Sequence, residues 1–200
     1  MSVRIVDETE FGLGWMETTA QSRTSHALVV EGRVWLVDPI EPEGVEERIR
    51  ALGEPVGVVQ LLDRHNRASA SLASRLGVPL HVVPESLSET PFELLPIVRR
   101  RFWAEVALWW PERRALVCAD VLGTNPFFRA SDEPVGVHPV LRFIPPRRLL
   151  GLGVEHLFVG HGEGLHGIGT AAQVDDAVSN ARRRIPRWLR GVPRIVRRGY

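Results

Sequence analysis

The sequence predicts an α/β protein in which two similar halves form a four-layer αββα sandwich. Two observations lead to this prediction. Each half contains a strand hairpin that ends in an aspartate, then a buried apolar strand, then a loop that carries a histidine. Two such halves can bury one face of each sheet against the other and cover the outer faces with helices. At 200 residues, the chain suits one domain with a single large core.

In the first half, a hairpin is predicted over 26–37, because two apolar, β-branched runs flank the turn Glu31-Gly32. The hairpin ends at Asp38-Pro39, where proline stops the strand ladder. Further along we predict a helix over 44–52, a strand buried on both faces over 56–62, a helix ending at Leu76 and a short strand over 80–83.

The second half repeats this order. A hairpin is predicted over 105–118, and its exit carries Asp120. After a long loop over 123–140, we predict a short helix over 147–152, a strand over 156–159, a loop with His161 between two glycines, and a long helix that starts near Thr170. An aspartate after a strand is most often a turn residue, so we interpret Asp38 in that way.

Composition limits the cellular setting. Cys118 is the only cysteine, which excludes a disulfide within the chain and suits a reducing compartment. Acidic residues occupy the place where a signal peptide has its apolar core, and no apolar run has the roughly 18 residues that a membrane span needs. We therefore expect a cytoplasmic protein that does not contact a membrane.

Four segments in order give this sequence its resemblance to the metallo-β-lactamase superfamily. The run 58–68 and the helix after it resemble the family's buried strand, its Thr-His-x-His-x-Asp-His motif and a Leu-Gly-x-Pro step. The segment 110–122 is similar to the family's hairpin ending in Gly-Asp, and 158–162 to its late Pro-Gly-His-Gly. Residues 25–39 resemble the N-terminal hairpin. The resemblance implies the αββα fold and a loop edge that holds two metal ions.

The resemblance fails at most of the metal ligands. In the family's register, the ligand positions of the first motif hold Asp63, His65, Arg67 and Ala68, so only the second retains its histidine. Arg101 stands where the family has its middle histidine. Asp120 and His161 match the bridging aspartate and the last histidine, and both are candidate catalytic residues.

These replacements lead us to expect a dismantled dinuclear site and no bound metal. Alanine offers no donor atom, and arginine stays protonated and cannot bind a metal. The expected function is therefore binding of a small anionic ligand or partner in the old cleft, with Arg67 and Arg101 as the ligand-binding residues. Arg67 or Arg101 is also expected to point into the site and pair with Asp63 or Asp120.

Two alternatives remain open. A single zinc or other divalent ion could be held weakly by Asp63, His65 and Asp120, which would make the protein a mononuclear metal-dependent hydrolase. The second alternative is binding of a polyanion or nucleic acid through the C-terminus, where the last 22 residues contain eight arginines and no acidic residue.

The C-terminus also carries apolar residues that are unusual in a free basic arm. A helix face is predicted over 171–189, with Pro186 ending or kinking the helix. Trp188 and Ile195 belong to a set of apolar residues beyond that proline. We therefore expect 187–200 to dock on the domain or across a homodimer interface, and nucleic-acid binding to be the weaker alternative.

Overall fold

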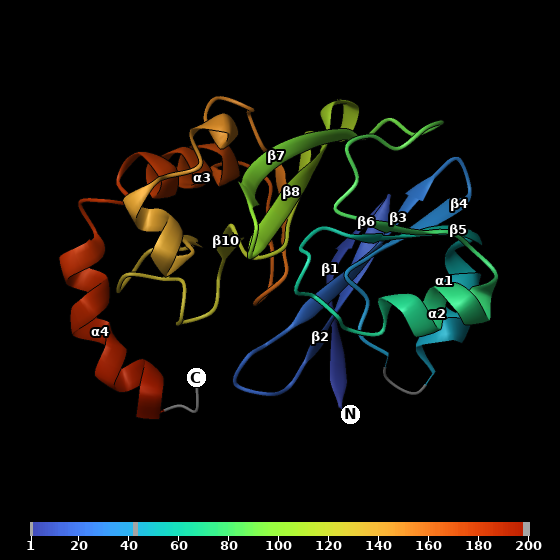
Figure 1. The fold of residues 1–200 in the computed structure, drawn as a ribbon, viewed down its shortest axis with the longest axis horizontal. Helices are drawn as coiled ribbons and strands as arrows, with labels where there is room; N and C mark the ends of the chain where they lie inside the picture. Colours follow the sequence, from blue (N-terminus) through green and yellow to red (C-terminus); the bar gives the residue numbers. More distant parts are fainter. Residues whose placement is uncertain (1, 42–43, 198–200) are drawn as a thin grey trace.

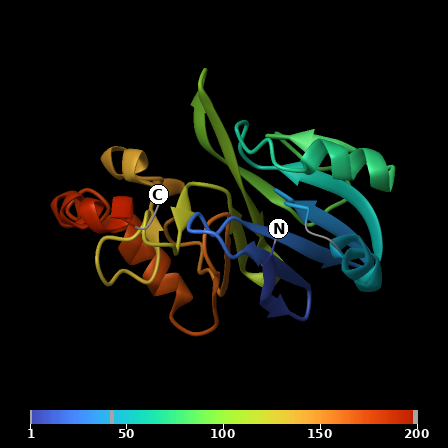
Figure 2. The same cartoon turned by 90° about the horizontal axis from the view of Figure 1, so that it is seen from below.

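Two β-sheets lie face to face with helices on their outer sides, in the order helix, sheet, sheet, helix (Figure 1). This arrangement is seen in a computed structural model that describes residues 2–41 and 44–197. In Figure 2, α1 (Val45–Leu52) and α2 (Ser69–Leu76) lie on one side of the molecule, and α3 (Thr170–Ser179) and α4 (Ile185–Arg197) lie on the other. The predicted αββα sandwich is therefore confirmed.

The first sheet has six strands in sequence order. They are β1 (Val3–Thr9), β2 (Gly12–Glu17), β3 (Thr24–Val30), β4 (Arg33–Val37), β5 (Glu54–Gln60) and β6 (Leu80–Val82). The hairpin of β3 and β4 turns at Glu31 and Gly32, which both have positive φ, as a tight two-residue hairpin requires. α1 and α2 cover the outer face through residues that include Ile49 and Leu72.

The second sheet has five strands in the order β13-β12-β9-β8-β7. They are β7 (Glu93–Arg100), β8 (Trp103–Trp110), β9 (Ala115–Cys118), β12 (His156–Val159) and β13 (Leu165–His166). A separate pair, β10 (Leu122–Gly123) and β11 (Gly136–Val137), precedes the short 3-10 helices η2 (Pro139–Phe143) and η3 (Arg147–Leu149); η1 (Pro111–Arg113) joins β8 to β9. α3 covers this sheet through Val174, Ala177 and Val178.

The main core lies between the sheets and is rich in aromatic rings. Its buried members include Phe11, Trp35, Phe92, Leu108, Trp110 and Phe158. At one edge, the two sheets also share backbone hydrogen bonds: Thr24 N–H donates to Gly160 O, and Val106 N–H donates to Leu61 O. These bonds tie the residue after β12 to β3 and the residue after β5 to β8, and the candidate site lies where these two connections meet.

Six strands and one helix boundary differ from the sequence expectation. The strands β1, β2, β7, β10, β11 and β13 were not predicted, because their patterns are short or mixed in polarity. The single helix predicted over 171–189 is wrong, since α3 ends at Ser179 and α4 begins at Ile185. Pro186 is the second residue of α4, where its missing N–H costs no helical hydrogen bond, so it marks a helix start and not an end.

α4 lies against the body of the protein. Trp188 Nε1 donates to Phe127 O at 2.7 Å, Ile195 is buried, and α4 contacts η2. The expectation for 187–200 also covers 198–200, which lie outside the described residues. No helix among the residues described is long and apolar enough to cross a membrane.

Candidate metal centre

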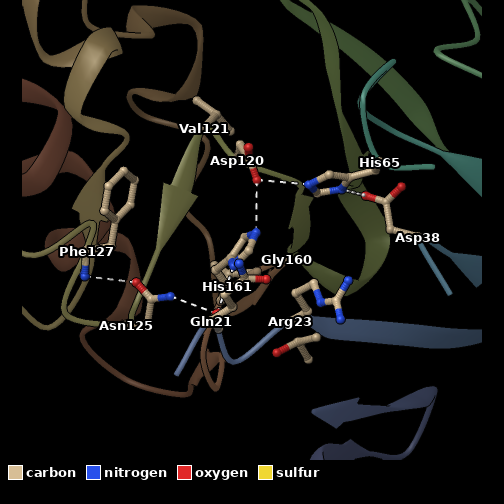
Figure 3. Close-up of polar contacts among 12 residues, drawn as sticks. Gln21, Arg23, Asp38, His65, Asp120, Val121, Asn125, Phe127, Gly160 and His161 are labelled. Atoms are coloured by element: carbon tan, nitrogen blue, oxygen red, sulfur yellow. Dashed lines mark hydrogen bonds and ion pairs between the residues drawn. The ribbon is translucent and has the colours of Figure 1, made fainter. Parts of the chain in front are cut away.

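His65 lies at the centre of a chain of three side chains. It stands in the loop after β5 and is buried, with its backbone N–H bonded to Leu62 O. Its Nδ1 is 3.1 Å from Asp38 Oδ2, and its Nε2 is 3.0 Å from Asp120 Oδ1 (Figure 3). The ring is therefore held between carboxylates from the two different sheets.

His161 reaches the same carboxylate from the loop after β12. Its Nε2 lies 3.3 Å from Asp120 Oδ1, and its Nδ1 lies 2.9 Å from Gln21 O. Because a carbonyl oxygen only accepts, Nδ1 carries a proton, and Nε2, which faces Asp120, is the nitrogen that would bind a metal ion after losing its own proton. Gly162 allows the tight turn that follows, with φ 99° and no space for a side chain beside Thr124.

Glu105 on β8 fixes the backbone of Asp120. Its buried carboxyl accepts hydrogen bonds from Asp120 N–H at 2.8 Å, from Val121 N–H at 2.6 Å and from Trp103 Nε1 at 2.9 Å. Burial, together with the negative charge of Asp120, raises the pKa of Glu105 to about 7. The side chain thus anchors the loop that presents Asp120.

The charges of the cluster are strongly coupled. Burial disfavours the charged form of Asp120, but hydrogen bonds from His161 and His65 outweigh it and hold the pKa of the carboxyl well below its usual range. Burial also opposes protonation of His65, yet the Asp38 and Asp120 carboxylates raise the pKa of that imidazole to about 9. Asp120 thus attracts a positive charge, which can be an imidazolium or a metal ion.

Three side chains fit a divalent metal ion. One nitrogen each from His65 and His161 and one oxygen of Asp120 lie within 4.8 Å of one another. Ligands of a tetrahedral zinc ion at ~2.0–2.1 Å from the metal are about 3.4 Å apart. The two His–Asp distances of 3.0 and 3.3 Å are close to that separation. In addition, the second nitrogen of each ring contacts an oxygen, as metal-binding histidines almost always do.

Asp63 is not part of this cluster, so the expected ligand set of Asp63, His65 and Asp120 is corrected. Asp63 Oδ2 accepts from Ala104 N–H at 3.0 Å and ties the loop after β5 to β8. His161 takes the third place. The sequence register aligned Asp63 with a ligand position, but a carboxylate side chain is shorter than imidazole and bonds to the nearby backbone.

The arginines do not pair with the carboxylates as expected. Arg67 donates to three carbonyl oxygens, those of Thr24 at 2.6 Å, Asp38 at 3.0 Å and Gly160 at 3.0 Å. Arg101 is exposed at the tip of the β7–β8 hairpin, with its guanidinium 5.3 Å from the Phe102 ring. Within the described part of the chain, neither forms an ion pair with Asp63 or Asp120. Arg67 instead crosslinks both sheets, since three carbonyls converge on its planar fork.

A pocket of about 250 Å³ opens beside Asp120 and His161. Its other lining residues are Gln21, Asn125, Phe127, Phe128 and His138. Phe128 stacks on His161 with ring centroids 5.6 Å apart. Burial lowers the pKa of His138 to about 4, so this ring is neutral near pH 7. The pocket is thus apolar on one wall and reaches the candidate ligands on the other.

Sequence reasoning missed Asp38, Glu105 and His138. Asp38 was assigned to a turn, and its positive φ of 44° agrees with a turn, but its carboxylate also orients His65. The signal that could have found it is the repeat itself, because Asp38 and Asp120 follow the two hairpins in the same way. Glu105 and His138 have no comparable sequence signal.

Comparison of the folds identifies the architecture. The DIM-1 metallo-β-lactamase superposes with a TM-score of 0.62 at 15% identity, over 90% of this chain and 99% of that one. The chain has the metallo-β-lactamase fold. A metallo-β-lactamase from Pontibacter korlensis matches with a TM-score of 0.60 at 10% identity, covering 90% and 100% of the two chains.

The same fold also occurs in a protein that is not a β-lactamase. A fragment of diflavin flavoprotein A 5 from Nostoc has a TM-score of 0.64 at 12% identity, over 92% of this chain and 98% of that one. No family model and no curated protein matches the sequence. The similarity therefore lies in the fold, and function has to be argued from the site.

Proposed function

We propose that this protein binds one divalent metal ion, for which zinc is the best match, and hydrolyses a small substrate in the adjoining pocket. His65 Nε2, an oxygen of Asp120 and His161 Nε2 would be the ligands. A zinc ion with three protein ligands and an open position lowers the pKa of a bound water to about 7 and polarises a substrate oxygen. The substrate side of the site is the 250 Å³ pocket.

The observation that carries the proposal is the contact made by the outer nitrogen of each histidine. Asp38 Oδ2 at 3.1 Å fixes the proton of His65 on Nδ1, and Gln21 O at 2.9 Å does the same for His161. With a metal ion bound, both Nε2 atoms would be unprotonated and would direct their lone pairs at the ion beside Asp120. The replacement of family ligands in the sequence favoured a metal-free protein. The contacts of the two Nδ1 atoms favour the single-metal alternative instead, with His161 in place of Asp63 as the third ligand.

The pocket residues suggest the substrate class. Phe127 and Phe128 supply an apolar wall that excludes water from one side of the site. Val140 N–H donates to His138 Nδ1 at 3.3 Å, so the proton of this neutral ring stands on Nε2, which can donate a hydrogen bond to a substrate oxygen. A small ester, amide or phosphoester with an apolar group fits these features.

A metal-free protein is the second candidate, and the raised pKa of His65 favours it. With a pKa of about 9, His65 is an imidazolium near pH 7 when no metal is bound, and it neutralises Asp120 without an ion. In that case the pocket would bind a ligand without hydrolysing it. Metal stoichiometry separates the two candidates.

The test is elemental analysis of the purified protein, followed by zinc titration against a chromophoric chelator. We expect about one zinc per chain and loss of binding in His65→Ala and His161→Ala. Asp63→Asn is the matched control, because Asp63 lies outside the cluster, and it should bind zinc as the parent does. Hydrolysis of chromogenic esters and phosphoesters should need zinc and fail in Asp120→Asn. Two zinc ions per chain, or none after titration, would contradict the proposal.

A further inference from the structure

A second cleft lies between the end of α3 and the first turns of α4, apart from the cluster around Asp120. It has a volume of about 420 Å³. Its lining residues are Asn180, Arg183, Arg184, Pro186, Arg187 and Arg190. Four of these six side chains carry a positive charge, and the lining contains no carboxylate.

The four guanidinium groups differ in how far they are neutralised. Arg184 is paired with Glu133 at 3.1 Å and with Asp176 at 2.7 Å. Arg187 has only a 3.5 Å contact with Asp132, and both of these side chains are largely exposed. Arg183 donates to the amide oxygen of Asn180, and Arg190 to the carbonyl of Pro186. Arg183 and Arg190 thus reach neutral acceptors, and the cleft keeps a net positive charge.

The sequence around the cleft contains no acidic residue that would offset the positive charge of its arginines. No acidic residue occurs from Ala177 to the end of the chain. Arg183, Arg187 and Arg190 follow one another at spacings of four and three, which places them along one side of the chain as it enters α4. Like charges at this spacing repel one another, and a bound anion removes that repulsion.

We propose that this cleft binds a compact phosphate group, either a phosphate monoester or a pyrophosphate. Planar guanidinium groups donate pairs of parallel hydrogen bonds to phosphate oxygens, and several arginines can share one multiply charged group. A cleft of 420 Å³ is large enough for such a group on a small molecule. The phosphate can belong to a soluble metabolite or to a lipid headgroup.

The site differs in place from the one expected from sequence. Arg67 and Arg101 were the expected anion ligands, but Arg67 is occupied by three carbonyls and Arg101 lies at a hairpin tip. The anion site proposed here uses other arginines. It does not depend on the metal centre, so either proposal can fail without the other.

The test is calorimetric titration of the full-length protein with inorganic pyrophosphate at 50 and 200 mM salt. We expect saturable binding that weakens as salt rises, and at least a tenfold loss of affinity in the double variant Arg183→Gln/Arg187→Gln. Arg147→Gln/Arg148→Gln removes the same charge from exposed positions of η3 and should bind within twofold of the parent. Far-UV circular dichroism checks that α4 is retained.

Two further arms identify the source and the chemistry of the anion. Vesicles of phosphatidylcholine with and without phosphatidic acid report binding to a phosphate-monoester headgroup; binding to either free pyrophosphate or these vesicles supports the phosphate site. Citrate bound as tightly as pyrophosphate would overturn it. So would equal losses in the two double variants, because the effect would then come from net charge alone. Binding of single-stranded RNA without binding of pyrophosphate would also overturn it.

Discussion

The carboxylate of Asp38 lies 3.1 Å from Nδ1 of His65 and determines which nitrogen of that ring faces Asp120. Its other oxygen accepts from Leu61 N–H at 3.1 Å, so the carboxylate itself is fixed by the start of the loop that carries His65. Asp38 and His65 are 27 residues apart in sequence, yet their side chains are in direct contact.

This contact predicts the effect of Asp38→Asn. If the amide oxygen keeps the bond from Leu61, the amide NH₂ faces His65 Nδ1 and forces the ring proton onto Nε2, which then cannot bind a metal. We expect the zinc dissociation constant to rise by roughly 10–100-fold. Chelator competition measures it, and thermal unfolding shows whether the variant is folded. Unchanged affinity in a folded variant would count against the role assigned to Asp38.

Gly162 gives a prediction about the loop of His161. An added Cβ would lie 2.1 Å from Thr124 Oγ1 and 2.8 Å from Asn125 N, and φ is 99°. Gly162→Ala should therefore destabilise the fold by about 1–3 kcal/mol and weaken zinc binding. Gly167→Ala is the matched control, since φ is 87° there but no atom lies within 4 Å of the added Cβ. Equal losses of unfolding free energy in both variants would show that backbone strain acts alone.

The buried pair of Arg142 and Glu133 supports the pocket wall. Arg142 is fully buried, bonds Glu133 Oε2 at 2.6 Å and donates to Phe128 O at 2.7 Å. Arg142→Met leaves a buried carboxylate whose remaining partners are Arg184 and the N–H of Ala130. We expect a loss of about 3 kcal/mol in urea unfolding. Arg4→Met, which breaks an exposed pair with Glu163, should cost less than about 1 kcal/mol. A loss in Arg142→Met no larger than in Arg4→Met would contradict this prediction.

His26 predicts how stability depends on pH. It is fully buried between the sheets, with Nε2 3.1 Å from Val159 O, and burial lowers its pKa from 6.5 despite the nearby charge of Asp7. Below pH 6.5 His26 becomes protonated in the unfolded chain but stays neutral in the folded chain. The free energy of unfolding therefore decreases as the pH falls from 6.5 toward the pKa of His26 in the folded state.

The variant His26→Gln keeps a donor for Val159 O but has no titrating ring. We expect its unfolding free energy to fall less steeply than that of the parent between pH 6.5 and 5. One proton accounts for a difference in slope of at most about 1.4 kcal/mol per pH unit. Urea unfolding at several pH values measures this difference. Parallel pH dependences in parent and variant would mean that His26 does not titrate differently in the two states.

The local sequence pattern was sufficient to predict those elements whose formation depends on neighbouring residues alone. Alternation and apolar runs predicted the hairpins around Gly32 and Pro111, because strands with one or two buried faces need those side chains. The predicted strand ends placed Asp120, His65 and His161 in loops, and the resemblance to the metallo-β-lactamase superfamily singled them out as site residues. The same pattern wrongly predicted one C-terminal helix where the structure has two. The helical spacing of apolar residues continues through 180–184, although no regular helix forms there.

The sequence by itself therefore determined the layers of the fold and the three side chains that meet at the site edge. Only the tertiary structure decided their partners. Asp120 is 55 residues from His65, and Gln21 is 140 from His161, and no local pattern records such pairings. The tertiary structure also placed Arg67 against backbone carbonyls and Asp63 against the N–H of Ala104. A buried polar group forms a hydrogen bond with the partner that packing brings within about 3 Å of it.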